Sequence, residues 1–263
     1  MKILRQTTSM LAIVLMAKMG ILCDPPNLEA QNTLNSVWPP VATFSILGHD
    51  PATGETGGAV QSRVFSVGNG VLWGEAGVGM VATQAIVDVS YGPQGLELLQ
   101  YGFSPTSVVS KILENDPNPR PETWTIQGRQ FSVMNSRGEV ATHTGPEASE
   151  WAGHVIRDNV SAQGNILAGP EVVQNMVETF ETTTGHLSFR LLAALEAGQD
   201  AGGDKRGMQS AAMLIVKKDG GVWLNNDTVL RLQVDDHTNP ITELRRLVEI
   251  ASRQRDRIRR NQF

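Results

Sequence analysis

The chain has 263 residues, a formal net charge of −5 and a pI near 5.6. This length suits one medium-sized domain with a substantial core, and 40% hydrophobic residues are ordinary for a soluble globular protein. The acidic balance argues against a protein that binds nucleic acid. The only cysteine is Cys23, close to the N-terminus, so the main part of the chain has neither a disulfide nor a thiol nucleophile.

The first 42 residues differ in character from the rest. Residues 1–22 are predicted to be an export signal, because Lys2 and Arg5 precede a mostly apolar run that is shorter than the roughly 20 residues of a spanning helix. Residues 23–42 are rich in Pro and Asn without a period, which indicates a linker or pro-segment. We therefore expect an exported protein, periplasmic or extracellular, with no integral membrane segment after processing and a single domain over residues 43–263.

The remaining chain alternates strands with pairs of helices. Polar and apolar residues alternate over 43–49, a turn with Pro51 and Gly54 follows, and 57–63 completes a hairpin. Strands are further expected at 73–84, 123–126, 130–134, 140–144, 160–163, 210–217, 221–224 and 229–234. Helices are expected at 92–101, 105–114, 170–182, 187–197 and 240–259. The antiparallel hairpins predict an α+β domain of stacked sheets with outer helices rather than a doubly wound parallel fold.

Several stretches, in order along the chain, resemble one family. They include Thr43-Phe44-Ser45-Ile46, Asp50-Pro51-Ala52-Thr53-Gly54-Glu55, Gly77-Val78-Gly79-Met80, Gln163-Gly164-Asn165, Gly203-Asp204-Lys205-Arg206-Gly207 and Asp235-Asp236-His237. The chain from about Thr43 to Val248 is similar to a family of unknown function placed in the N-terminal nucleophile (Ntn) hydrolase superfamily. The resemblance implies a four-layer αββα sandwich and cleavage of an amide-type bond.

Thr43 is the expected nucleophile if the chain is cut after Ala42. The cut would give Thr43 both a hydroxyl and a free α-amine, whose pKa of about 7.7–8.0 suits a general base. Ala42 is a small residue of the kind that precedes a processing site, and Ala30 offers another site with later trimming. Without the cut, Thr43 is an ordinary strand residue.

Other polar residues could complete such a site. Asn165 is expected to donate to an oxyanion, or else to cap the next helix. Arg63 ends a strand and is expected to hold a carboxylate or the charge of an intermediate, or else to be solvated. Thr83 and Gln84 end a Gly-rich strand and could donate to substrate, or else be plain polar strand ends.

A second group crowds a Gly-flanked loop that enters a strand: Asp204, Arg206, Gln209 and Ser210. Such loops often carry function, so we predict substrate contacts for these residues. An internal Asp204–Arg206 ion pair that only shapes the loop is the alternative. The five His show no ligand spacing, so no metal and no cofactor are expected.

The sequence thus predicts an exported amidohydrolase that acts on a small-molecule or peptide amide. The alternatives are a secreted binding module that keeps the fold without catalysis, and a structural envelope protein. The sequence leaves open whether the chain forms a homo-oligomer.

Overall fold

Strand β1 (Thr43–Asp50) runs through the centre of the larger of two antiparallel sheets. The computed structural model describes residues 43–261, with side chains for residues 43–258. The predicted export signal at 1–22 and the linker at 23–42 lie outside the described residues. Phe44 and Ile46 face a helical layer, whereas Leu47 packs between the two sheets. This alternation places Thr43 and Ser45 on the face of β1 that looks at the second sheet.

The six-stranded sheet has the order β10-β9-β2-β1-β8-β7, and the four-stranded sheet has the order β3-β4-β5-β6. The strands of the first sheet besides β1 are β2 (Glu55–Ser62), β7 (Ala152–Arg157), β8 (Val160–Asn165), β9 (Ser210–Val216) and β10 (Thr228–Val234). Those of the second are β3 (Leu72–Glu75), β4 (Gly79–Ala85), β5 (Arg129–Asn135) and β6 (Val140–Thr144). All strand pairings in both sheets are antiparallel, as the predicted hairpins require.

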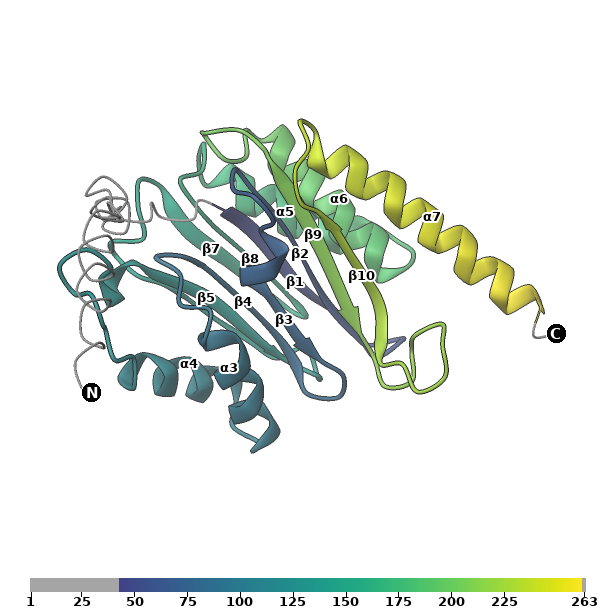
Figure 1. Ribbon diagram of the computed structural model, residues 1–263, viewed down its shortest axis with the longest axis horizontal. Helices are drawn as coiled ribbons and strands as arrows, with labels where there is room; N and C mark the ends of the chain where they lie inside the picture. The colour runs from purple at the N-terminus through teal and green to yellow at the C-terminus, as the bar shows by residue number, and fades with distance from the viewer. Residues whose placement is uncertain (1–42, 262–263) are drawn as a thin grey trace, which may run out of the picture. The chain divides into compact units, whose positions relative to one another are not determined.

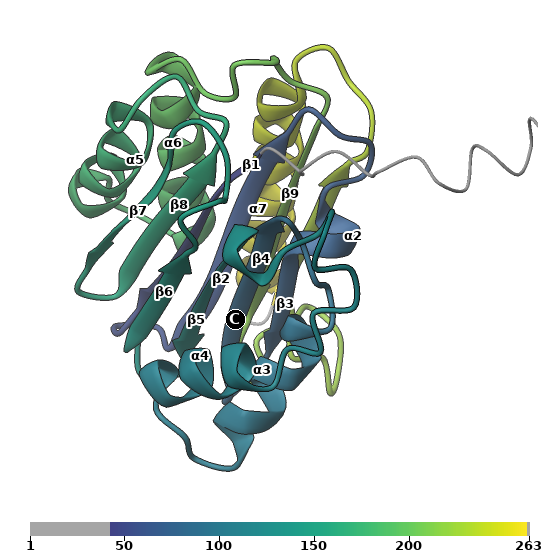
Figure 2. The same ribbon diagram turned by 90° about the vertical axis from the view of Figure 1, so that its left-hand side faces the viewer.

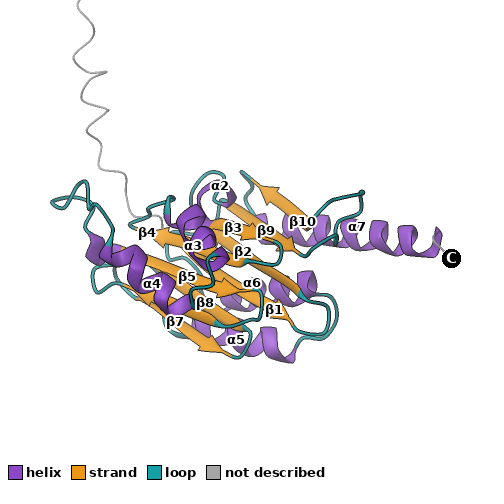
Figure 3. Cartoon of the chain, turned by 90° about the horizontal axis from the view of Figure 1, so that it is seen from below, coloured by secondary structure: helices purple, strands orange, loops and turns teal. Residues whose placement is uncertain are grey.

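Helices cover the outer faces of both sheets (Figures 1 and 2). The described residues form six α-helices and one 3-10 helix: α2 (Gly68–Val71), α3 (Tyr91–Gln100), α4 (Pro105–Glu114), η2 (Ile126–Gly128), α5 (Glu171–Thr182), α6 (Leu187–Asp200) and α7 (Pro240–Asn261). The amphipathic faces of α5, α6 and α7 pack on the six-stranded sheet. Helices α3 and α4 pack on the four-stranded sheet, as seen from below in Figure 3. The prediction of an α+β fold is confirmed.

The interface between the two sheets is apolar at one end and polar at the other. Leu47, Val60, Met80 and Leu214 belong to its apolar cluster. Near the start of β1 the inner face instead carries buried polar residues, among them Ser45, Gln84 and Gln163. Buried polar groups require hydrogen-bond partners, so this end of the interface must be a specific network.

Two predicted strands are absent, and the single strand expected over 73–84 is instead the antiparallel hairpin of β3 and β4. Residues 123–126 form turns that lead into η2, where the Thr125 side chain accepts from the Gln127 N–H at 3.1 Å. Residues 221–224 belong to the loop between β9 and β10, and β10 itself pairs with β9. The edge strand β7 and the short helix α2 were not expected, because β7 has no buried face to produce an alternating pattern.

The loop after α4 is anchored to β5 by a buried ion pair. Arg129 Nε donates to Asp116 Oδ2 at 2.9 Å, and the Tyr91 hydroxyl donates to the same oxygen. Burial raises the pKa of Asp116, but the hydrogen bonds from Arg129 and Tyr91 and the charge of Arg129 outweigh it, so this pKa is lowered overall. Asp116 therefore remains charged above its lowered pKa and holds the loop against the sheet.

Candidate functional site

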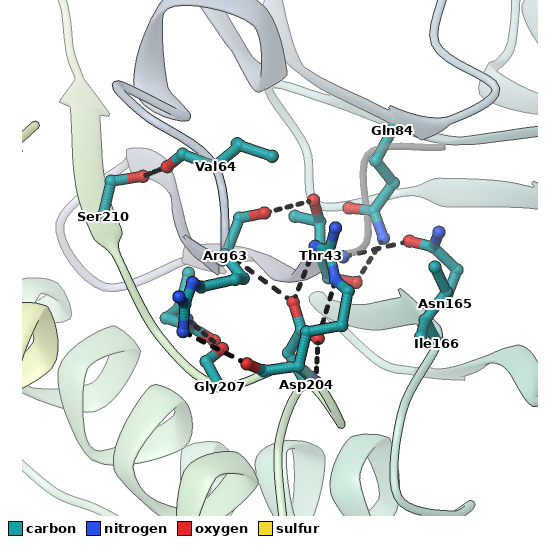
Figure 4. A network of polar contacts seen from close by, with 12 residues as sticks. Thr43, Arg63, Val64, Gln84, Asn165, Ile166, Asp204, Gly207 and Ser210 are labelled. Atoms are coloured by element: carbon teal, nitrogen blue, oxygen red, sulfur yellow. Dashed lines mark hydrogen bonds and ion pairs between the residues drawn. The ribbon is translucent and has the colours of Figure 1, made fainter. Parts of the chain in front are cut away.

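Thr43 begins β1 between two neighbouring strands. Its register partners are Ser62 on β2 and Asn165 on β8. The Thr43 N–H donates to Asn165 Oδ1 at 3.1 Å, and the Thr43 hydroxyl donates to Ser62 Oγ at 3.2 Å. All three residues are fully buried. The fold thus connects the nitrogen and the hydroxyl of Thr43 to different neighbours, and Figure 4 shows Asn165 and Gln84 on one side of Thr43 and Arg63 on the other.

Asn165 is the last residue of β8 and has one unused donor. Its Oδ1 accepts from Thr43, while Nδ2 is buried and has no hydrogen-bond partner among the described residues. A buried donor without an acceptor costs about 1–3 kcal/mol, so such groups are rare in native proteins. Asn165 does not cap α5, whose N-cap residue Pro170 makes no side-chain cap bond. The amide is therefore positioned beside Thr43 with a donor available to another group.

Gln84 of the facing sheet holds the carbonyl of Thr43, and Gln130 is bonded to Gln84. Gln84 Nε2 donates to Thr43 O at 3.1 Å and to Gln130 Oε1 at 2.9 Å, while Gln84 Oε1 accepts from the Ser45 hydroxyl at 2.7 Å. Gln130 Nε2 in turn donates to Gly164 O at 2.9 Å on β8. These bonds fix the orientation of both amides and tie the start of β1 to strands β4, β5 and β8.

The chain of hydrogen bonds from Thr43 through Gln84 and Gln130 to His154 is uncharged. Gln130 Nε2 also donates to the Thr144 hydroxyl at 3.0 Å, which lies 2.8 Å from His154 Nδ1. Burial lowers the pKa of His154, so its ring is neutral at neutral pH. The hydrogen-bond partners given above for the backbone and hydroxyl of Thr43 are likewise neutral side chains.

Asp204 shapes the loop beside the site. Its buried carboxylate accepts from the backbone N–H of Arg63 at 3.2 Å and of Arg206 at 2.8 Å. The Arg206 guanidinium pairs with it through Nε at 3.2 Å and Nη2 at 3.0 Å. Arg63 Nη1 donates to Arg206 O at 3.2 Å, and the Arg63 side chain is otherwise exposed. The internal ion pair is thus formed, and it holds Arg63 directly after Ser62.

The same loop supports the end of β8. Lys205 N–H donates to Ile166 O at 3.1 Å, and Ala168 N–H donates to Gly203 O at 3.0 Å. Ile166 follows Asn165 and has a φ of +54°, a left-handed conformation that is strained for a β-branched residue. These contacts hold the strand end at which Asn165 turns toward Thr43.

Three predicted residues lie apart from Thr43. Thr83 is on the opposite face of β4 from Gln84, and its hydroxyl donates to Asp88 O at 3.2 Å. Gln209 Nε2 donates to Asp236 at 3.2 Å. Ser210 pairs with Ser62 in the sheet, but its hydroxyl donates to Val64 O at 2.6 Å and accepts from Val67 N–H at 3.1 Å. The hydrogen bonds of these three side chains connect loops and strands.

Sequence reasoning missed Ser62, Gln130 and Gln163. Gln163 Nε2 donates to Ala82 O at 3.0 Å and so bridges the two sheets. A signal for it was present, since Ser161, Gln163 and Asn165 alternate along β8 with small residues. Gln130 carried no such signal, because its role depends on the way the second sheet stacks on the first.

The described residues contain no group of three or more His, Cys, Asp or Glu side chains that could hold a metal ion. Over the same part of the chain, no helix combines the length and the apolar character needed to cross a membrane.

Comparison with known proteins places this architecture in a family. Residues 43–244 match the model described as "Family of unknown function (DUF1028)", and the chain belongs to that family. It is similar to the crystal structure of protein SPO2555 from Silicibacter pomeroyi, assigned to the same family model. The two share 34% sequence identity with a TM-score of 0.71 over 80% of this chain and 86% of the other. A search of curated proteins found no match.

Proposed function

We propose that the mature protein begins at Thr43 and is an Ntn hydrolase with the four-layer αββα sandwich of that superfamily. The observation that carries the proposal is the set of contacts at Thr43: its nitrogen at Asn165, its hydroxyl at Ser62, and an unpaired amide donor on Asn165. The match to the family also starts at Thr43, so the preceding residues lie outside the shared domain. The helices outside two stacked sheets agree with the proposed sandwich.

The proposed reaction uses one residue as nucleophile and base. The free α-amine of Thr43 takes the proton from the Thr43 hydroxyl as Oγ1 attacks the carbonyl carbon of an amide. Asn165 Nδ2 donates to the oxyanion of the tetrahedral intermediate. The protonated amine then gives its proton to the leaving nitrogen, the C–N bond breaks, and an ester with Thr43 remains. Water attacks this ester with the amine again as base, releasing the acid and restoring the hydroxyl.

The exposed Arg63 is the proposed contact for a negatively charged substrate group. It directly follows Ser62, and its position is fixed by the Asp204 carboxylate and the Arg206 carbonyl. Guanidinium groups suit planar carboxylates, so an amide that also carries a carboxylate is the favoured substrate class. Gln84 positions Thr43 through its carbonyl rather than contacting substrate.

Processing is a necessary part of the proposal. Thr43 is fully buried in the chain as described, and its nitrogen is a peptide amide, which is not a base. Export processing that removes residues 1–42 would create the amine. The complete burial of Thr43 favours the second candidate, a non-catalytic binding module, if this cut does not occur.

The test begins with intact mass and N-terminal sequencing of the protein recovered outside the cytoplasm. We expect a chain that starts at Thr43. An activity screen over amides with and without a carboxylate then compares wild type with three variants. Thr43→Ser should retain partial activity, whereas Thr43→Ala and a chain with one residue fixed before Thr43 should both be inactive. The extended variant keeps the hydroxyl but has no amine, so it separates the two roles.

The matched control is Thr242→Ala, which removes an exposed threonine of α7 and should leave activity unchanged. An acyl-trapping inhibitor followed by mass mapping should locate the adduct on Thr43. An adduct on another residue, or full activity of the extended chain, would falsify the assignment of Thr43 as an N-terminal nucleophile. The non-catalytic binding module would then be the favoured function.

A further inference from the structure

The loop between β9 and β10, residues 217–227, presents two consecutive apolar side chains to solvent. Trp223 is 74% exposed and Leu224 is 93% exposed. The loop is built by specific hydrogen bonds: Gly221 N–H donates to Asn226 O at 2.7 Å, and Asn226 N–H donates to Trp223 O at 3.2 Å. Trp223 and Leu224 therefore stand on an ordered turn, and we call these two residues the Trp–Leu tip.

The C-terminal half of α7 lies next to this tip. A groove of about 510 Å³ is lined by Val222 and Trp223 from the loop and by Ala251, Gln254 and Arg255 from α7. In Figure 1 the β9–β10 loop and the last turns of α7 are both on the right-hand side of the molecule. The Trp–Leu tip and the end of α7 thus contribute to one region of the surface.

The charge of this region is opposite to that of the whole chain. Residues 217–231 and 250–258 together contain six basic and three acidic residues, a net +3, although the whole chain carries −5. The rest of the chain therefore carries −8. Lys218 is paired with Asp227 at 3.2 Å, and Arg253 lies 3.9 Å from Glu249. We call residues 250–258 the basic helix end.

We propose that the Trp–Leu tip and the basic helix end together bind the surface of an anionic lipid membrane. Trp is favoured at the boundary between lipid and water, where its ring contacts both acyl chains and headgroups. Basic side chains beside it are attracted to anionic headgroups. The proposed contact is peripheral, because it is made by side chains on the surface of the domain.

A second copy of the chain fits this region less well. A stable protein–protein interface buries about 800 Å² on each partner, whereas one aromatic side chain buries about 150–250 Å². The Trp–Leu tip is a small projecting feature, and the positive charge beside it would repel the same charge on another copy. An anionic membrane offers both an apolar interior for the tip and opposite charge for the helix end.

The test is co-sedimentation of the full chain with two kinds of vesicle: phosphatidylcholine alone, and phosphatidylcholine mixed with an equal amount of phosphatidylglycerol. We expect binding to the mixed vesicles that weakens with salt, and little binding to phosphatidylcholine alone. The double variant Trp223→Ser/Leu224→Ser should bind at least about tenfold more weakly, because two exposed apolar side chains are lost. Arg253→Gln/Arg257→Gln should also weaken binding to the mixed vesicles.

The control is Tyr101→Ser, which removes an aromatic side chain that is 73% exposed after α3. It should bind as wild type does, and thermal unfolding should show that every variant is folded. Residues outside the described part of the chain are common to all variants, so their contribution cancels in the comparison. Equal binding by the tip variant, or no binding of wild type to anionic vesicles, would overturn the proposal. It would also be overturned by a wild-type dimer, without lipid, that the tip variant abolishes.

Discussion

The sharpest prediction concerns Asn165→Asp, which replaces the side-chain NH2 group beside Thr43 with an oxygen. Aspartate has the shape of asparagine, so its Oδ1 keeps the position 3.1 Å from the Thr43 nitrogen. The other half of the side chain changes from a donor to an acceptor. The variant therefore removes the proposed oxyanion donor and places a negative charge next to the proposed amine, where the wild type has the neutral amide of Asn165.

The distance sets the size of the effect on the pKa of the amine. Opposite charges 3.1 Å apart attract by about 5 kcal/mol at an effective dielectric constant of about 20. This equals roughly four pKa units and is an upper limit, because desolvation of the buried carboxylate opposes it. We expect the amine pKa to rise by about 1–3 units from its ordinary value of about 7.7–8.0. A smaller fraction of the amine is then free base at neutral pH, so activity requires a higher pH.

The amine pKa can be measured before any substrate is known. The pH dependence of acylation of the α-amine, followed by mass spectrometry of the N-terminal peptide, gives the pKa in wild type and variant. Once a substrate is found, kcat should fall by about 10²–10³ even at the pH optimum, because the donor is absent. Gln94→Glu, the same amide-to-acid change on exposed α3, is the matched control and should shift neither quantity. An unchanged amine pKa in Asn165→Asp would refute the placement of the amine at Asn165.

Two further predictions concern stability. Arg129→Met leaves the buried carboxylate of Asp116 without its cation and should lower the free energy of unfolding by about 3–5 kcal/mol near neutral pH, measured by urea unfolding. The folded-state pKa of Asp116 is lowered, so the stability that its ion pair contributes is present above the unfolded pKa and is lost as pH falls through the folded pKa. A difference in unfolding free energy between wild type and Arg129→Met that stayed constant into acid would contradict this. Gly48→Ala places a Cβ 2.6 Å from the Phe180 ring and should cost about 1–3 kcal/mol. Gly70→Ala, with 3.5 Å to its neighbour, should not destabilise, and equal Tm values for the two variants would count against the packing argument.

The sequence predicted most of the fold because amphipathic patterns are local. The hairpin of β1 and β2 and helices α3 to α7 have alternating or helical apolar patterns, and all of them form. Edge strand β7 was missed because its partly exposed residues show no such pattern. The predicted strand at 221–224 is wrong because Trp223 and Leu224 are apolar but exposed. Apolar residues indicate a buried strand only where they are in fact buried.

The site was predictable only in part, because its contacts join residues that are distant in sequence. Asn165 could be singled out as a polar residue after a strand, but its bond to Thr43 depends on β8 pairing with β1. Thr83 and Gln84 were equivalent in sequence, and the pleat of β4 decides between them: Gln84 faces the first sheet and Thr83 faces away. Asp204 and Arg206 were predicted to contact substrate, with an ion pair that shapes the loop as the alternative. The ion pair forms, since residues two apart can meet within one turn, and the predicted substrate contact stays a prediction.

Stability alone does not explain why buried amide side chains lie beside Thr43. An apolar layer such as the one around Leu47 and Met80 could have continued along the whole interface between the sheets, and it would have required no partners. Instead, Gln84 donates to the carbonyl of the first residue of β1 and to Gln130, and the Nδ2 donor of Asn165 lies beside that residue without a partner. A buried polar network fixes one arrangement of its members when it is fully bonded, and each missing bond is costly. The arrangement fixed here is that of Thr43. Among the described residues, Asn165 Nδ2, the atom that would meet a substrate oxyanion, and Gln163 Oε1 both lack a hydrogen-bond partner. A fixed Thr43 and an unpaired donor beside it are both expected if the network exists to position a nucleophile, and neither is expected of a strand that only joins two sheets.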